Sequence, residues 1–101
     1  MFIYNITVKV NHAILDKWLQ WQYEILIPEI MATGLFYEYR FYQLLEQDEE
    51  EGKTFVIQFL ANAKSDYDKY ILDFAPQLRA KGLEKWGDQI IAFRSLLQNV
   101  Q

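Results

Sequence analysis

The sequence predicts an α+β domain in which two amphipathic helices cover one face of a four-stranded antiparallel sheet. Apolar and polar residues alternate from the N-terminus onward, as they do in a strand with one buried face. Two later segments carry apolar residues three and four positions apart, which is typical of amphipathic helices. A polar segment that ends in glycine separates two runs rich in aromatic and β-branched residues, as in a hairpin. The predicted order of elements is therefore βαββαβ.

The first strand and the first helix follow from a change of period. Residues 2–10 are the expected strand, with apolar side chains at alternate positions: Phe2, Tyr4, Ile6, Val8 and Val10. Residues 12–33 are the expected helix, because apolar side chains then follow at spacings of 4, 3 and 4: Ile14, Trp18, Trp21 and Ile25. Asn11 is the expected N-cap, and Gly34 is expected just after the C-cap. Pro28 lacks an N–H and is expected to kink the last turns.

A long hairpin is expected from residues 35–46 and 53–61, which are rich in aromatic and β-branched side chains. The segment between them is polar and carries consecutive carboxylates at residues 48–51. These carboxylates lack the alternating ligand spacing and the central glycine of an EF-hand loop. We therefore expect a solvated hairpin tip and no calcium site.

The second helix begins after the hairpin, with Ser65 as its expected N-cap and apolar side chains at helical spacing: Tyr67, Ile71, Phe74 and Leu78. Pro76 is expected to bend this helix. Gly82 and Gly87 are expected to bracket a short turn. Residues 90–97 then form the final strand. Four strands and two helices in this order make the ferredoxin-like arrangement.

The chain length allows one domain. With about 100 to 200 residues per domain, the 101 residues are expected to form a single ferredoxin-like domain that spans residues 1–101. The chain contains 7 Tyr, 7 Phe and 3 Trp, which supply a large apolar area for a core. This composition excludes a disordered chain.

Charge and composition narrow the classes of partner and the compartment. The net charge is -4, so the chain lacks the positive field that binds phosphate backbones, and no nucleic-acid partner is expected. No segment reaches the ~18 apolar residues of a membrane span, and the N-terminus does not read as a signal peptide. The absence of cysteine excludes disulfides and thiolate chemistry. We expect a cytoplasmic protein with no membrane partner.

Alternation also sorts the strand residues onto two faces of the sheet. The more apolar face is assigned to the helices: Phe2, Tyr4, Ile6, Val8, Leu35, Tyr37, Tyr39, Phe41, Phe55, Ile57, Phe59, Ile91 and Phe93. The other face is mixed and stays open: Asn5, Thr7, Lys9, Phe36, Glu38, Arg40, Tyr42, Thr54, Val56, Gln58, Ala92, Arg94 and Leu96. Exposed apolar area usually marks an interface, so this face favours a homodimer. Its apolar members are Phe36, Tyr42, Val56 and Leu96.

The polar members of the open face are the candidate site: Asn5, Thr7, Glu38, Arg40, Tyr42, Gln58 and Arg94. Charged groups taken out of water must be paired or must meet a ligand. One interpretation is structural, with Glu38 pairing an arginine across strands and fixing the register of a dimer. The other is a cavity for a small anionic or carbonyl-bearing molecule, with arginine as a bidentate donor. The sequence leaves both open.

Catalytic residues are not defined by any motif. His12 is the one histidine, so no two-histidine metal site can form within one chain, and no metal or cofactor is expected. His12 lies where the first strand meets the first helix, where an exposed or capping side chain is more common than a base. Neither a nucleophile elbow nor a glycine-rich phosphate loop is present.

Several short motifs carry a resemblance to a known family: residues 3–8, Ile27-Pro28 followed by Ala32-Thr33-Gly34, the acidic turn at residues 48–52, Ala75-Pro76 and residues 92–97. Together they resemble a family of short bacterial proteins known only as a domain of unknown function. More distantly, the chain resembles the dimeric α/β-barrel superfamily, which includes small monooxygenases, haem-degrading enzymes and stress proteins. That resemblance implies that two sheets close their open faces into one barrel.

These observations lead to two functional hypotheses. The first is a non-enzymatic homodimer that binds a small molecule, possibly an anion, or a protein partner. The alternative is a cofactor-independent oxygenase or isomerase of the dimeric-barrel type. In that alternative Tyr42, Arg40 and Arg94 polarise a substrate, and His12 or Glu38 takes a proton.

Overall fold

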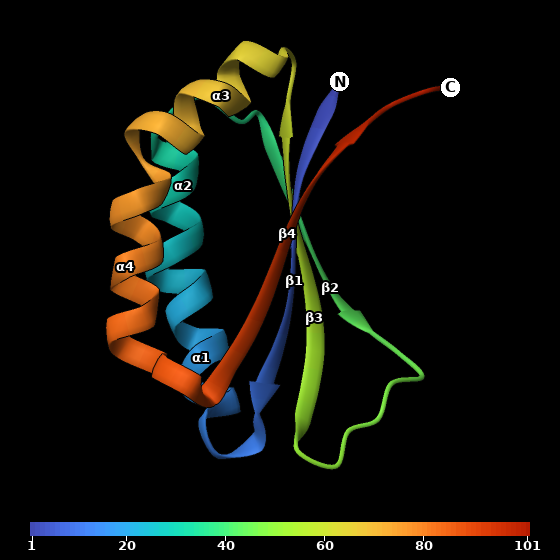
Figure 1. Ribbon diagram of the computed structural model, residues 1–101, viewed down its shortest axis with the longest axis vertical. Coiled ribbons are helices and arrows are strands. Elements are labelled where there is room, and N and C mark those ends of the chain that lie inside the picture. The colour runs from blue at the N-terminus through green and yellow to red at the C-terminus, as the bar shows by residue number, and fades with distance from the viewer.

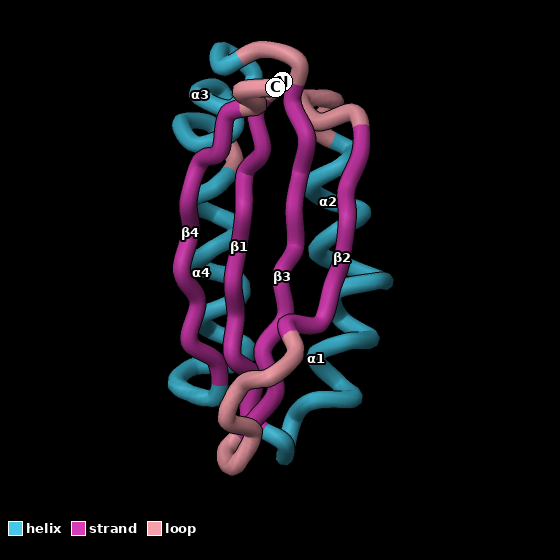
Figure 2. The backbone as a smooth tube through the Cα atoms, turned by 90° about the vertical axis from the view of Figure 1, so that its right-hand side faces the viewer, coloured by secondary structure: helices cyan, strands magenta, loops and turns pink.

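The N-terminal strand β1 (Phe2–Asn11) lies inside the sheet, between β3 (Gly52–Ala61) and β4 (Ile90–Gln98). The strand β2 (Glu38–Leu44) pairs with β3 at the far edge, so the order is β2-β3-β1-β4 and every neighbouring pair is antiparallel. The computed structural model describes residues 1–101, and all its helices lie on one side of the sheet (Figure 1). The other face is open to the viewer in Figure 2. The predicted α+β class and βαββαβ order are confirmed.

The first helical segment runs without a break from residue 12 to residue 32 but changes its type of turn along the way. It consists of the 3-10 turn η1 (His12–Ile14), α1 (Leu15–Trp21), the π-helical η2 (Gln22–Leu26) and α2 (Ile27–Ala32). Asn11 caps its start as predicted, since the Asn11 Oδ1 accepts a hydrogen bond of 2.8 Å from the Ala13 N–H. Gly34 follows its end with a φ of 74°. The irregularity expected at Pro28 takes the form of a π turn just before it.

The second helical segment consists of α3 (Lys64–Asp73) and α4 (Ala75–Trp86), followed by the 3-10 turn η3 (Gly87–Gln89). The break between α3 and α4 lies just before Pro76, as predicted. The N-cap predicted at Ser65 is wrong, because the helix begins at Lys64 and the extended Ala63, two residues before Ser65, is the N-cap. None of the helices is both long and apolar enough to cross a membrane.

The turn predicted between Gly82 and Gly87 is also wrong, because α4 continues through Gly82. A glycine inside a helix costs backbone entropy but does not have to end it. Gly82 lies beside the ring of Trp21, and a Cβ at Gly82 would be 4.0 Å from the nearest Trp21 atom, an ordinary van der Waals contact. Only Gly87 ends the helix, and its φ of 56° is one that L side chains rarely adopt.

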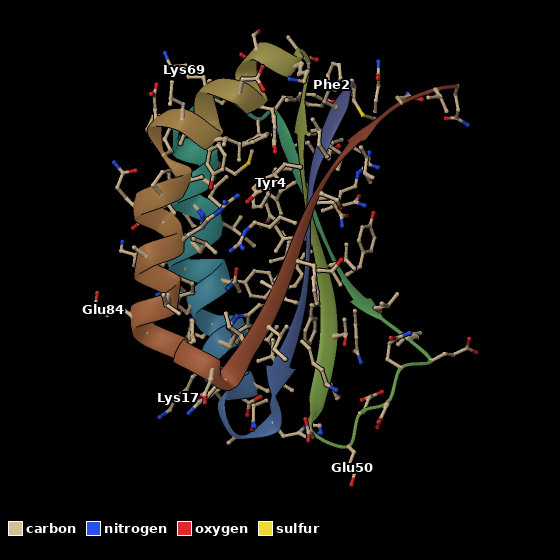
Figure 3. All side chains as sticks on the ribbon, in the orientation of Figure 1. Phe2, Tyr4, Lys17, Glu50, Lys69 and Glu84 are labelled. Atoms are coloured by element: carbon tan, nitrogen blue, oxygen red, sulfur yellow. The ribbon has the colours of Figure 1, made fainter.

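The core lies between the sheet and the helices. Trp18 from α1 and Phe59 from β3 are fully buried. Tyr4 from β1 lies between the two layers (Figure 3). Its ring centroid is 5.5 Å from that of Tyr70 and 6.2 Å from that of Phe36. The ring of Phe59 lies 6.3 Å from that of Tyr4, so aromatic rings from β1, β3, α3 and the loop before β2 meet at one point of the core.

Two face assignments before β2 are wrong. Phe36 is only 4% exposed and belongs to the core, although alternation placed it on the open face. Tyr37, assigned to the helix side, is half exposed. The physical reason is that β2 starts only at Glu38, so the two-residue period of a strand does not apply to the residues before it.

The faces of β4 are reversed relative to the prediction. In antiparallel pairs, directly opposed residues point to the same side of the sheet. Arg94 opposes the buried Ile6, so Arg94 points toward the helices, while Phe93 opposes Thr7 on the open face. The same register turns Ala92 and Leu96 toward the helices and Ile91 to the open face. Apolar residues occupy both the odd-numbered and the even-numbered positions of this edge strand. Alternation alone therefore did not determine which positions face the helices.

Gly52 allows the start of β3 to approach β1 closely, and a Cβ there would overlap the Val10 carbonyl oxygen. We expect Gly52→Ala to lower the free energy of unfolding by about 1 to 3 kcal/mol or more, because backbone cannot move aside cheaply. Gly82→Ala is the matched control, and the gain in helix propensity should raise stability by about 0.5 to 1 kcal/mol. Urea unfolding of both variants measures the two changes, and changes of the same sign would contradict this account.

Candidate ligand-binding cavity

Part of the predicted polar cluster lies together on the open face. Asn5 on β1 opposes Gln58 on β3, and the Gln58 Nε2 donates a hydrogen bond of 3.2 Å to the Asn5 Oδ1. The Asn5 Nδ2 in turn donates to the Thr7 Oγ1 at 3.3 Å. These three side chains satisfy one another across two neighbouring strands.

The charged part of the cluster is an ion pair within a single strand. The Arg40 Nη2 lies 3.1 Å from the Glu38 Oε2, and both side chains are close to half exposed. Glu38 thus pairs with an arginine, as the structural interpretation expects, but along β2 and not across strands. Tyr42 lies two residues further on the same face, opposite Val56.

Arg94 does not belong to this cluster, because it lies on the other face of the sheet. His12 is also remote from it, since the His12 Nε2 lies 2.6 Å from the Glu49 carbonyl oxygen at the hairpin tip. The residues named for the enzymatic alternative are therefore divided between the two faces of the sheet and the hairpin end. Whether the open-face residues bind a ligand stays a prediction.

A cavity of about 330 Å³ lies on the helix side of the sheet, where α4 runs behind β1 and β4 (Figure 2). Strands β1 and β4 form its floor, and α1, η2 and α4 form its roof. Of the 19 residues that line it, 14 are hydrophobic, including Trp18, Trp21 and Trp86. The glycine at position 82 adds room, because it places no side chain in this space.

Two buried polar atoms in the cavity wall have no hydrogen-bond partner, the Gln22 Oε1 and the Trp86 Nε1. Gln22 is 2% exposed and Trp86 is 7% exposed. A buried polar atom without a partner costs about 1 to 3 kcal/mol, so such atoms are rare and each needs an explanation. One atom is an acceptor and the other a donor, and both lie beneath the surface of the cavity, out of contact with solvent.

Two arginines border the cavity on the α4 and β4 side, Arg79 from α4 and Arg94 from β4. The Arg79 Nη2 donates a hydrogen bond of 3.2 Å to the Tyr4 hydroxyl oxygen. Both arginine side chains belong to exposed residues, whereas Gln22 and Trp86 are buried. The cavity therefore has a cationic, solvent-accessible end and a buried end with unpaired polar atoms.

Tyr70 forms part of the same wall and is 2% exposed. Burial raises the pKa of the Tyr70 phenol well above its usual range, and the nearby Tyr4 adds to the increase. Arg79 and Arg94 act on the same pKa in the opposite direction, so both guanidinium groups lie near this phenol. Tyr70 is thus a neutral hydroxyl at physiological pH and not a proton acceptor.

Sequence patterns did not indicate this cavity or its residues Gln22, Tyr70, Arg79 and Trp86, and strand alternation placed Arg94 on the wrong face. One signal was available, because Gln22 follows Trp18 by four residues and so interrupts the apolar face of the first helix. The remaining residues come together only through the packing of α4 on β4.

The fold and the cavity define a small ferredoxin-like protein with a partly polar chamber between its layers. The chain belongs to the family described as domain of unknown function (DUF4286), whose profile matches residues 1–100. This confirms the resemblance found in the sequence. A comparison with curated proteins finds no match to this chain.

Solved structures share the fold over nearly the whole chain. A dimeric ferredoxin-like protein from an uncultured marine organism has a TM-score of 0.72 at 10% identity, covering 99% of this chain and 95% of its own. A second such protein, also from an uncultured marine organism, has a TM-score of 0.63 at 16% identity, covering 100% and 96%. An ethyl tert-butyl ether d (EthD) family protein from Bacillus halodurans C-125 has a TM-score of 0.67 at 7% identity, covering 99% and 100%. These likenesses confirm the ferredoxin-like fold.

The raised pKa of Tyr70 predicts a loss of stability at alkaline pH. An unfolded tyrosine releases its proton near pH ~10, whereas folded Tyr70 keeps it, so the folded state binds more protons and stability falls as pH rises above ~10. This single group lowers the free energy of unfolding by up to ~1.4 kcal/mol for each pH unit above that point. Tyr70→Phe should remove that part of the slope, measured by denaturant unfolding between pH 9 and 11.5. If the free energy of unfolding falls equally steeply with pH in the variant and the wild type, this role of Tyr70 is refuted.

Proposed function

We propose that this protein is a non-enzymatic homodimer whose subunits each bind a small molecule in the cavity between the sheet and the helices. The observation that carries the proposal is the cavity itself, which is lined mostly by apolar side chains and bordered by two arginines, Arg79 and Arg94, that form no salt bridge. A space that arises only from imperfect packing is lined by apolar groups, which need no partner. Guanidinium groups that border such a space without a carboxylate partner fit an anionic or carbonyl-bearing ligand.

The size of the cavity supports the same proposal. Ligand sites measure about 300 to 1,000 Å³ and combine apolar walls with a few polar groups. At about 330 Å³ the cavity lies at the lower end of that range. A small metabolite fits this space better than a large cofactor.

The homodimer rests on the open face of the sheet. Large apolar side chains are exposed there, among them Tyr42, Leu44, Ile91, Phe93 and Leu97. An exposed apolar patch of this kind favours an interface. A second copy of this chain fits it, since a twofold dimer places the patch of one subunit against the same patch of the other. Two of the structural neighbours are described as dimeric ferredoxin-like proteins, which supports this proposal. The cavity lies on the opposite side of the sheet, so dimer formation leaves it accessible.

The open-face polar cluster has a structural role in this proposal. Asn5, Thr7 and Gln58 bond to one another, and Glu38 pairs with Arg40, so neither group needs a ligand to satisfy it. Such groups fix the register of an interface more than they strengthen it. The cytoplasmic location that the sequence indicates remains part of the proposal.

The enzymatic alternative, a cofactor-independent oxygenase or isomerase, is less well supported. Such chemistry requires a group that accepts a proton near neutral pH. The titratable side chains that line the cavity are two tyrosines and two arginines: Tyr4, Tyr70, Arg79 and Arg94. The histidine and carboxylate side chains that most often abstract a proton do not line the cavity, so its wall is better suited to binding and polarisation.

The wild-type protein should sediment as a dimer at micromolar concentration, and Phe93→Glu should shift it to a monomer. Phe93 is 69% exposed on the open face, so a carboxylate there would be buried without a partner in the interface. Leu72→Glu is the matched control, because Leu72 is 77% exposed but lies on α3 in the helix layer. Analytical ultracentrifugation measures both, and a monomeric wild type would exclude the homodimer.

Native mass spectrometry of protein purified from its own host tests the cavity. We expect a bound small molecule, and we expect Ala92→Leu to lose it because Ala92 lines the cavity. Ser95→Leu, on the same strand but on the open face, should retain the molecule. A wild-type mass equal to that of the bare chain, with no shift in melting temperature on addition of small metabolites, would overturn the binding function.

A further inference from the structure

We infer that the cavity between the sheet and the helices takes a small carboxylate with an apolar tail. The acid group of this ligand lies at Arg79 and Arg94, and its tail lies against the apolar wall. The inference rests on the proposed binding function and adds the chemical class of the ligand. Three observations carry it: two arginines that approach Tyr4, the lack of acidic side chains in the wall, and the apolar character of the remaining wall.

Arg79 and Arg94 approach Tyr4 from two different layers. The Arg79 Nη2, on α4, donates a hydrogen bond of 3.2 Å to the Tyr4 hydroxyl oxygen. On the sheet, Tyr4 opposes Leu96, and Arg94 lies two residues before Leu96 on the same face. Such diagonal neighbours are about 7 to 8 Å apart, within reach of long side chains. Burial raises the pKa of the Tyr70 phenol, whose ring centroid is 5.5 Å from that of Tyr4, and both guanidinium groups oppose this increase. The two cations therefore flank one pair of tyrosines.

The two guanidinium groups have no anionic partner in the chain. They are the only charged groups in the cavity wall, and neither forms a salt bridge. The salt bridges of the protein use other cations, on Arg40, Lys64 and Lys81. Like charges held near each other repel, and a bound anion relieves that repulsion. The site therefore favours an anion, although the net charge of the chain is -4.

A carboxylate matches this site better than a phosphate. Each guanidinium presents a planar fork of N–H donors that pairs with two carboxylate oxygens. Phosphate sites commonly add backbone N–H groups from a helix N-terminus or a glycine-rich loop. The first residues of α4, from Ala75 to Gln77, do not line the cavity, and the chain has no glycine-rich phosphate loop. Both arginines are exposed residues, so the acid group keeps part of its hydration.

The rest of the wall suits an apolar tail. Most of the lining residues are hydrophobic, among them the buried Trp18, Ile30 and Ile57. The Gln22 Oε1 and the Trp86 Nε1 lie beneath this surface, so they present no hydrogen bond to a ligand. Each methylene that leaves water for such a wall strengthens binding. If each non-hydrogen atom takes about the 30 Å³ of a liquid water molecule, the cavity of about 330 Å³ holds roughly ten of them, the size of octanoate.

The test titrates the wild-type protein with octanoate by isothermal titration calorimetry. Two matched compounds each remove one feature: octanamide lacks the negative charge, and hexanoate lacks two methylenes of the tail. We expect octanamide to bind at least about tenfold more weakly than octanoate, because the charge-assisted bonds to guanidinium are lost. We expect hexanoate to bind about fifteenfold more weakly, because each buried methylene contributes about fourfold.

Variants assign the acid group to the two arginines. Arg79→Met and Arg94→Met keep an apolar stem and remove the charge, so each should weaken octanoate about tenfold or more and leave octanamide unchanged. Arg40→Met on the open face is the matched control and should leave both affinities unchanged. Ala92→Leu fills part of the cavity and should remove most of the advantage of octanoate over hexanoate. The comparison of octanoate with octanamide on the wild type needs no variant, so it decides even if a variant fails to fold.

Equal affinities for octanoate and octanamide, or for octanoate and hexanoate, would overturn the inference. Tighter binding of octyl phosphate than of octanoate, or no binding of octanoate at millimolar concentration, would also overturn it. If octanoate fails while another molecule co-purifies with the protein and is lost in Ala92→Leu, the binding function stands and only the ligand class is wrong. If nothing co-purifies and no small metabolite raises the melting temperature, the proposed function fails as well.

Discussion

The position of β1 inside the sheet is the constraint on which the rest of the structure depends. Its pairing with β3 on one side and β4 on the other fixes which side chains of all three strands face the helices. Tyr4, Ile6 and Val8 on its helix side build both the core and the floor of the cavity. A one-residue slip would turn these residues to the open face, so the register is set by the burial of their apolar area.

The sequence was sufficient to predict the order of elements because strong periodicity and clear caps mark their limits. The Asn11 cap, the Gly34 terminus and the break before Pro76 all rest on local backbone chemistry, which a sequence displays directly. These local signals failed where the same residue is compatible with two backbone conformations. An alanine in extended conformation replaced Ser65 as the N-cap, and the glycine at position 82 was tolerated within a helix.

The candidate site was less accessible to prediction, for a different reason. Alternation shows that odd-numbered and even-numbered residues of a strand point to opposite faces, but only pairing with neighbouring strands decides which set faces the helices. In β4 both sets contain apolar residues. Arg94 was therefore placed with Arg40, from which the sheet separates it. The unpaired atoms of Gln22 and Trp86 depend on how three helical elements pack, and no sequence pattern encodes an absent hydrogen bond.

The even-numbered and the odd-numbered residues of β4 belong to two different surfaces. Ala92 and Arg94 border the cavity, while Ile91 and Phe93 lie on the open face. As an edge strand, β4 is held by hydrogen bonds on one side only, so it has more freedom to shift than the central strands. In the proposed homodimer, a ligand that moved β4 would change the affinity of one subunit for the other, and by thermodynamic reciprocity the association of subunits would change the affinity for the ligand to the same degree. Under that proposal, occupancy of the cavity and assembly of the dimer would be a single linked equilibrium.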